Sequence, residues 1–260
     1  MGLGECQCRR KPPYGVDPMP QTWCRRSGAL EPVIPTSNRF PRGPHLSKLV
    51  RAIRDPKLAI SVLSALALGG FYKWWYPFRG LRFKAGKNLR VFGRLEVRGP
   101  GRVAFGDNVT VGMRVTPFTH HVDATITIGS HCFLNGVRFG CAKSIDIGEY
   151  CILAESRIMD SNFHSTRADR WSANAPVRVK AVILARNVWV AADAGILPGT
   201  EIGENSVVGF GSVCSGRYPA NSLIAGNPAV VVRDIEPSPT DLQSRRKIMS
   251  ENPLDADPPV

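Results

Sequence analysis

The sequence predicts an all-β protein folded as a β-solenoid, and two observations support this class. The first is an apolar residue at every sixth position over one long stretch: Leu184, Val190, Ile196, Ile202, Val208 and Cys214. The second is a glycine directly after many such residues, where a tight corner leaves no room for a side chain. This period fits neither a helix nor an ordinary strand. It fits a chain that turns a corner after each short flat run and points one small apolar side chain inward.

Three such runs would close one triangular coil, so that residues 18 positions apart stack in neighbouring coils. Stacking buries apolar surface that a single coil would expose. The expected pairs are Leu184 with Ile202, Val190 with Val208, and Ile196 with Cys214. The same spacing returns upstream, broken by insertions, at Phe105 and Val111, at Ile128 and Leu134, and at Ile147, Leu153 and Met159. We therefore expect residues 86–236 to form the solenoid.

The segments that flank the solenoid differ from it in composition. The chain carries a formal net charge of +13, yet residues 1–102 hold 20 Lys or Arg against 5 Asp or Glu, whereas residues 103–260 hold 14 against 16. Residues 1–45 and 237–260 are rich in Pro and polar residues and lack periodicity. Neither segment can bury enough apolar surface to offset the entropy of ordering, so we expect both to be disordered. Seven scattered cysteines, none in a metal-binding spacing, indicate a reduced, cytoplasmic protein without disulfides.

Residues 46–85 form a helical segment that has three interpretations. Leu58–Leu68 suits a helix that Gly69 and Gly70 would end, and a collar of aromatic and basic residues follows. The helix could lie on the inner face of an anionic membrane as a peripheral contact. It could instead cap the solenoid, or span the bilayer, although its apolar run is shorter than the ~20 residues that a span needs. Nucleic acid is not an expected partner, because no base-stacking module accompanies the basic residues.

Three short motifs add to the repeat. The segment Asp160–His164 has the form D-x-x-x-H and interrupts the hexads, Asn187–Val190 reads NVWV, and Ala225–Ala229 reads AGNPA. With these motifs the sequence resembles the hexapeptide-repeat acyltransferases, most closely their sugar and xenobiotic O-acetyltransferase branch. The resemblance covers about residues 86–235. It implies a left-handed parallel β-helix, acetyl-CoA as the acyl donor, and a homotrimer with its active sites between subunits.

The resemblance also implies roles for individual residues. His164 corresponds to the catalytic base, and Asn135 to an asparagine near the acceptor; Asn135 could alternatively bond its own solenoid corner. Asp160 could orient the imidazole of His164, or it could bond backbone N–H groups of the loop. The residues that flank the coenzyme A groove would be Trp189, Ala191, Gly209, Gly226, Asn227 and Pro228.

Two functions follow from these residues. The first is transfer of an acetyl group from acetyl-CoA to a hydroxyl of a small-molecule or glycan acceptor, in polysaccharide biosynthesis. A histidine base suits it, because a hydroxyl must lose its proton to attack a thioester near neutral pH. The alternative is a catalytically inactive solenoid that serves as a scaffold or ligand-binding subunit. No metal is expected, since His120, His121 and His131 lack the spacing of zinc ligands. The sequence does not identify the acceptor, nor whether oxygen or nitrogen is acylated.

Overall fold

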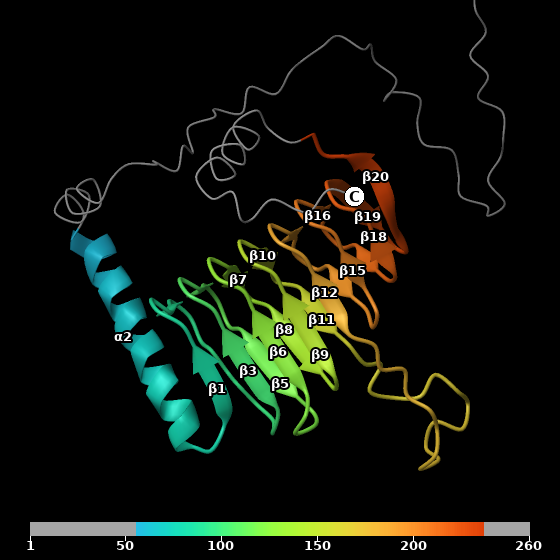
Figure 1. Cartoon of the computed structure of the whole chain (residues 1–260), viewed down its shortest axis with the longest axis horizontal. Helices are drawn as coiled ribbons and strands as arrows, with labels where there is room; N and C mark the ends of the chain where they lie inside the picture. The colour runs from blue at the N-terminus through green and yellow to red at the C-terminus, as the bar shows by residue number, and fades with distance from the viewer. Residues whose placement is uncertain (1–55, 237–260) are drawn as a thin grey trace, which may run out of the picture. The chain divides into compact units, whose positions relative to one another are not determined.

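The computed structural model describes residues 56–236, which form a triangular parallel β-solenoid with helix α2 at its N-terminal end (Figure 1). The predicted all-β solenoid is confirmed. The disorder expected for residues 1–45 and 237–260 concerns segments outside the described residues. In each coil the chain passes through three sheets in turn, named here the first, second and third sheet.

Each sheet consists of short strands from successive coils, side by side. The first sheet contains β1 (Arg82–Ala85), β3 (Arg102–Phe105), β6 (Thr125–Ile128), β9 (Ser144–Ile147), β12 (Val182–Leu184), β15 (Glu201–Ile202) and β18 (Arg217–Tyr218). The second contains β2 (Arg90–Val91), β4 (Thr110–Val111), β7 (Phe133–Asn135), β10 (Ile152–Ala154), β13 (Trp189–Val190), β16 (Val207–Val208), β19 (Ser222–Gly226) and β20 (Ala229–Asp234). The third contains β5 (Thr116–Thr119), β8 (Arg138–Cys141), β11 (Arg157–Met159), β14 (Gly195–Ile196) and β17 (Val213–Cys214).

The register of the coils follows the predicted pairs. Leu184 lies opposite Ile202, Val190 opposite Val208, and Ile196 opposite Cys214, and all six side chains are buried in the core.

One upstream position departs from the predicted pattern. The spacing predicts that Met159 faces inward, but Ile158 is the buried residue opposite Ile196, and Met159 is half-buried on the outer surface. The corner after Leu153 is one residue shorter than the corner after Val190, and this moves the inward position.

Asparagines brace the corner between the first and second sheets. Asn187, Asn205 and Asn221 occupy this corner in successive coils with φ near +57°, a left-handed conformation that asparagine tolerates. Their side chains form a ladder, in which Asn187 Nδ2 donates to Asn205 Oδ1 and Asn205 Nδ2 donates to Asn221 Oδ1, both at 3.0 Å. The corner geometry is therefore repeated from coil to coil by hydrogen bonds as well as by packing.

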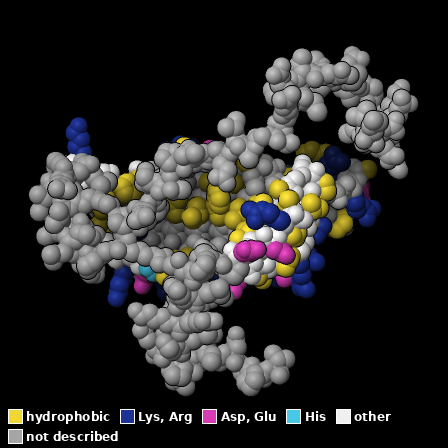
Figure 2. All heavy atoms as spheres, turned by 90° about the horizontal axis from the view of Figure 1, so that it is seen from above, with side chains coloured by type: hydrophobic (Ala, Val, Ile, Leu, Met, Phe, Trp, Pro, Cys, Tyr) yellow, Lys and Arg dark blue, Asp and Glu magenta, His cyan; other side chains and the backbone are white. Residues whose placement is uncertain are grey.

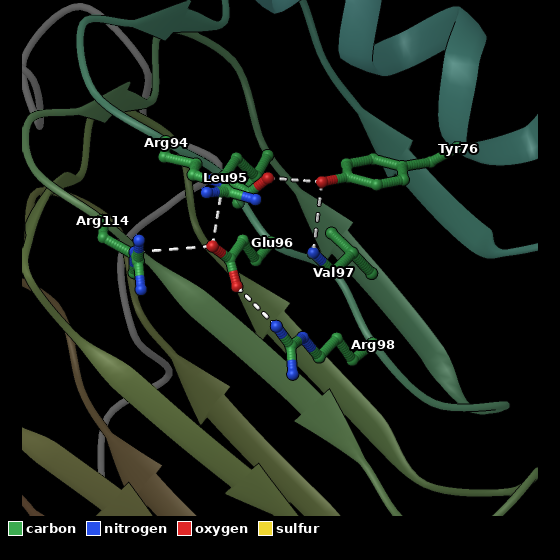
Figure 3. A network of polar contacts seen from close by, with 7 residues as sticks. All are labelled: Tyr76, Arg94, Leu95, Glu96, Val97, Arg98 and Arg114. Atoms are coloured by element: carbon green, nitrogen blue, oxygen red, sulfur yellow. Dashed lines mark hydrogen bonds and ion pairs between the residues drawn. The ribbon is translucent and has the colours of Figure 1, made fainter.

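Helix α2 (Pro56–Phe78) packs across the first coil. It continues past Gly69 and Gly70, so the predicted end at these glycines is wrong. The reason is tertiary, because a Cβ on Gly69 would lie 2.0 Å from the carbonyl oxygen of Leu89, and only glycine allows this close approach. The buried Tyr76 donates its hydroxyl hydrogen to the carbonyl oxygen of Leu95 and accepts a hydrogen bond from the N–H of Val97 (Figure 3).

Of the three interpretations of residues 46–85, the capping one is supported by these contacts. Within residues 56–236, no helix has both the length and the apolarity needed to cross a bilayer. The solenoid also starts earlier than expected, at Arg82 and not near Gly86. Phe83, which lies before the predicted start of the solenoid, is the first side chain of the core column that continues through Val103.

The two ends of the solenoid are closed differently. α2 covers the end at β1 and β2, whereas at the far end the chain reverses and β20 pairs antiparallel with β19 (Figure 1). The turn between β19 and β20 holds the AGNPA motif, and its peptide bond between Asn227 and Pro228 is cis. All other strand pairs in the described residues are parallel, apart from an isolated bridge in the loop described below.

Candidate active site

The corner between the second and third sheets carries one column of mostly small residues, and we call it the Asn135 edge. In coil order the column is Gly112, Asn135, Ala154, Ala191, Gly209 and Ala225. Small side chains leave the edge open along several coils. Asn135 therefore lies in line with two of the six predicted cofactor residues, Ala191 and Gly209. Another of the six, Gly226, directly follows the last position of the column.

The amide of Asn135 is anchored on one side only. Its Oδ1 accepts a hydrogen bond of 2.9 Å from the N–H of Met113. Gly112 makes room for this bond, because a Cβ there would lie 2.5 Å from the same oxygen. Within residues 56–236 the Nδ2 of Asn135 donates no hydrogen bond, so the amide is fixed in place with two N–H groups available to a ligand.

An exposed apolar column runs along the outside of the second sheet, next to this edge. Trp189 of β13 is 48% exposed and lies in register with Ile152 and Val207, and Ile152 in turn with Phe133. Figure 2, which views the molecule from the side of β7, β10 and β16, shows hydrophobic side chains gathered along the uncovered part of this face. Asn227 and Pro228 are exposed in the turn after β19, in the last coil.

His164 lies on a different corner, between the third and first sheets. It belongs to the insertion of residues 160–181, the His164 loop, which projects from the solenoid between β11 and β12 (Figure 1). The two ends of this loop are joined by an antiparallel bridge between Ser161 and Val179. The N–H of Asn162 donates to the carbonyl oxygen of Arg178 at 3.1 Å. His164 itself is exposed.

Phe163 anchors the loop to the solenoid directly before His164. Its backbone is left-handed, with φ at 58°, and its N–H donates to the hydroxyl oxygen of Ser161 at 3.0 Å. The ring packs over Gly140, where a Cβ would approach it to 3.0 Å, and its centroid lies 4.2 Å from that of His120. This packing places His164 at the rim of the third sheet.

Asp160 sits at the base of the loop and is fully buried. Its carboxylate accepts hydrogen bonds from the N–H groups of Ala142 and Lys143, at 2.7 and 2.6 Å, and one from the thiol of Cys141 at 3.4 Å. Burial, and secondly the charge of Asp160, raise the pKa of that thiol, which keeps it protonated as a donor. Of the two roles left open by the sequence, only backbone bonding has contacts within residues 56–236, and its N–H groups belong to the preceding coil and not to the loop. Orientation of His164 by Asp160 stays a prediction.

Two adjoining cavities lie on the outer side of the third sheet, between the Asn135 edge and the His164 loop. The larger, of about 530 Å³, is lined by Met113, Gly136 and Glu155 near the edge. The smaller, of about 340 Å³, is lined by Phe118, His120, Met159 and Phe163 near the loop. Arg138 and Arg157 line both cavities, so the two hollows meet at this pair.

Comparison with known proteins identifies the solenoid. The family model described as "Bacterial transferase hexapeptide (six repeats)" matches residues 181–216. The Escherichia coli K12 protein named "Putative lipopolysaccharide biosynthesis O-acetyl transferase WbbJ" is 31% identical over 148 residues, which are 53% of this chain and 74% of that protein. The chain belongs to the hexapeptide-repeat acyltransferase family. The predicted enzyme class, a CoA-dependent acyltransferase, is confirmed by this membership.

Solved structures agree with the fold of this acyltransferase. A mutant of AntD, an N-acyltransferase from Bacillus cereus, aligns with a TM-score of 0.54 and 16% identity over 68% of this chain and 95% of that chain. The polysialic acid O-acetyltransferase OatWY aligns with a TM-score of 0.52 and 24% identity over 60% of this chain and 76% of that chain. The predicted left-handed parallel β-helix is the fold of the family.

The structure thus brings some predicted site residues of the acyltransferase together and separates others. Asn135 and the small cofactor residues share one edge, whereas His164 lies on another corner of the same subunit. Sequence reasoning missed Phe163, Arg138 and Arg157. Phe163 lay inside a quoted motif, but its left-handed backbone was not foreseen. The two arginines are 19 positions apart, and only the known length of each corner would have shown that they are neighbours.

Proposed function

We propose that this acyltransferase transfers the acetyl group of acetyl-CoA to a hydroxyl of a sugar or glycan precursor, with His164 as the general base. The observation that carries the proposal is the alignment of Asn135 with the small residues Ala191 and Gly209 along one open edge. The names of the relatives support the choice of acceptor: WbbJ is linked to lipopolysaccharide biosynthesis and OatWY to polysialic acid.

The edge suits a long, thin cofactor. An acetyl-CoA molecule that lies along it would pass Gly226, Gly209 and Ala191, where a larger side chain would obstruct it, and Trp189 would offer an apolar surface nearby. The thioester would then reach Asn135. The free N–H groups of this amide would stabilise the negative charge that develops on the thioester oxygen, without a change of protonation.

The chemistry then requires one proton acceptor. As the acceptor oxygen attacks the thioester carbon, its proton passes to the imidazole of His164, and a tetrahedral intermediate forms. Its collapse breaks the carbon–sulfur bond, and the imidazolium returns the proton to the leaving thiolate. The products are the acetyl ester and coenzyme A, and no covalent enzyme intermediate is needed.

A homotrimer would complete this site. Asn135 and His164 occupy different corners of one subunit, so a loop from a neighbouring subunit is a direct way to bring an imidazole to the Asn135 edge. The tip of the His164 loop supports such a contact, because the Trp171 side chain is 93% exposed. Closed cyclic assemblies place the same two surfaces together at every interface. Sedimentation of the full chain should give the mass of three subunits, and an active monomer would contradict the arrangement.

The function is tested by His164→Ala. We expect kcat to fall by about 10²- to 10⁴-fold, the usual effect of a general base, while the KM for acetyl-CoA changes little. The assay follows thiol release from acetyl-CoA with a panel of sugars, sugar nucleotides and amines. A matched control is His131→Asn. His131 stacks on Tyr150 at the remaining corner, between the first and second sheets, and its φ of 63° suits asparagine. A trimeric His164→Ala protein with wild-type turnover would leave the scaffold function as the better account.

A peripheral membrane contact at the cytoplasmic face is the second part of the proposal. The side of α2 that faces away from the first coil is apolar and exposed, with Ile60, Leu63, Trp74 and Phe78 each more than 60% accessible. The basic residues Arg79, Arg82 and Lys84 follow it. This arrangement suits the surface of an anionic bilayer.

Vesicles that contain phosphatidylglycerol provide the test. The triple variant Leu63→Ser, Trp74→Ser and Phe78→Ser should bind them more weakly than the wild type, and added salt should weaken binding of both. The control is Phe210→Ser, which changes a 73% exposed side chain on the C-terminal coils. Equal binding by the triple variant and the wild type would contradict the membrane contact.

A further inference from the structure

Two arginine side chains lie next to each other on the third sheet. Arg157 of β11 is paired with Arg138 of β8 in the parallel ladder, and both are exposed. Like charges directly opposite each other destabilise a sheet. Within residues 56–236 neither guanidinium group takes part in a hydrogen bond or an ion pair.

The arginines nearer α2 show how this protein otherwise neutralises such charges. The carboxylate of Glu96 forms ion pairs with Arg94, Arg98 and Arg114 at 2.8, 2.8 and 3.4 Å (Figure 3). The Glu96 side chain is only 11% exposed, and this single carboxylate compensates the charge of three guanidinium groups. Arg138 lies two coils beyond Glu96 and Arg157 three, and among the described residues neither has an equivalent carboxylate.

The two cavities that meet at the pair differ in their acidic residues. Glu96, Glu155 and Asp193 line the larger cavity, and within residues 56–236 none of them forms an ion pair with Arg138 or Arg157. The smaller cavity has no Asp or Glu in its lining. Burial, and secondly the charge of His121, lower the pKa of His120, which lines this cavity and thus stays neutral near pH 7.

The remaining walls of the smaller cavity are apolar and lead to the proposed base. Phe118, Met159 and Phe163 form them, and Phe163 directly precedes His164. Aromatic walls suit the C–H faces of a sugar ring. A guanidinium pair suits the planar oxygens of a carboxylate or the oxygens of a phosphate, which it can bind with two parallel hydrogen bonds.

We propose that Arg138 and Arg157 bind an anionic group, a carboxylate or a phosphate, on the acceptor sugar, and that the smaller cavity holds its ring. The proposal rests on the proposed function and names the acceptor class as an acidic saccharide or a sugar phosphate. A hydroxyl on the bound ring then lies on the side of the third sheet from which the His164 loop projects. The arginines select and position the acceptor and do not take part in proton transfer.

A binding experiment tests the arginine pair without relying on catalysis. The full chain is titrated by calorimetry with methyl glucuronide, glucose 1-phosphate and the neutral methyl glucoside. We expect at least one anionic sugar to bind about tenfold more tightly than the neutral one, which corresponds to about 1.4 kcal/mol. The double variant Arg138→Gln and Arg157→Gln should lose this preference. The anion that binds more tightly distinguishes a carboxylate from a phosphate.

The control is Arg102→Gln, which removes an exposed arginine of the first sheet and should keep the preference, since among the described residues its guanidinium group forms no hydrogen bond or ion pair. The double variant must retain the thermal unfolding midpoint of the wild type. A wild type with no preference for the charged sugars overturns the inference, and so does a double variant that keeps it. An oligomer that dissociates in the double variant also overturns it, because the arginines would then contact another subunit.

A kinetic arm separates this inference from the proposed function. With an acidic acceptor, the double variant should show an acceptor KM raised about tenfold, with kcat and the KM for acetyl-CoA nearly unchanged. A raised KM for acetyl-CoA would overturn the inference, since the arginines would then hold the phosphates of the cofactor. If the wild type binds acidic sugars through the pair but releases no thiol, the proposed function fails and the binding site stands.

Discussion

The regular coils and the His164 loop are held in place by different means. In the coils, residues such as Val190, Ile196 and Val208 are fully buried and stacked in register, and an asparagine ladder joins successive coils at the corner between the first and second sheets. The loop departs from this scheme after Met159 and is fixed mainly at its base, by the Ser161–Val179 bridge, Asp160 and Phe163. The two regions therefore have different roles. The repeat sets the positions of the predicted cofactor residues, and the loop contains the proposed base.

The largest effect should come from a change inside the coils. Phe139 is fully buried in the third sheet, between Pro117 and Ile158 in the ladder. Phe139→Ala should lower the free energy of unfolding by about 3–5 kcal/mol, because it removes apolar contacts and leaves a cavity. Urea denaturation measures the loss. The change in the loop, Asn174→Ala, alters an exposed side chain and should stay within about 0.5 kcal/mol, and similar losses in both variants would erase the distinction.

An intermediate effect should come from the base of the loop. Asp160→Asn should lower the free energy of unfolding by about 1.5–3 kcal/mol. The carboxylate offers one oxygen to each of two N–H groups, whereas an amide has a single acceptor oxygen. Activity should fall as well, because the same residue holds the start of the loop. The control is Asp169→Asn, whose exposed ion pair with Arg167 should be worth about 0–1 kcal/mol. An Asp160→Asn protein of wild-type stability but low activity would instead favour a role in orienting His164.

The smallest effect should be a dependence of stability on pH at the contact between loop and coils. Because burial lowers the pKa of folded His120, the unfolded chain binds more protons as the pH falls. The contribution is therefore present above the unfolded pKa of about 6.5 and is lost as the pH falls through the lower folded value. His120→Gln should reduce the decline in unfolding free energy between about pH 7 and pH 5. An unchanged decline would show that His120 is not responsible.

The sequence predicted best what depends on the period alone. A strict spacing of six encodes both the sheet and the register, so the three pairs from Leu184 to Cys214 were confirmed. The end of α2 was wrong because the helix-breaking tendency of Gly69 is overridden by its contact with Leu89. Met159 was misplaced because the corner after Leu153 is one residue shorter than the corner after Val190.

The candidate site was predicted in part. The motifs located His164, Asn135 and the cofactor residues, but the sequence could not show that they lie on two different corners. The backbone bonds of Asp160 depend on Ala142 and Lys143, one coil earlier, and no local pattern reveals such a partner. The pairing of Arg138 with Arg157 likewise depends on the exact length of a coil that departs from the ideal repeat.

The two closed ends described above limit how this repeat can grow. A stack of parallel coils ends in unpaired backbone groups, and such edges can recruit further strands and build fibres. Here the helix, locked by Tyr76 onto Leu95 and Val97, covers one terminal coil, and the reversed strand β20 changes the direction of pairing at the other. The repeat could in principle continue without limit. The contacts at its two ends limit the addition of further strands from other chains.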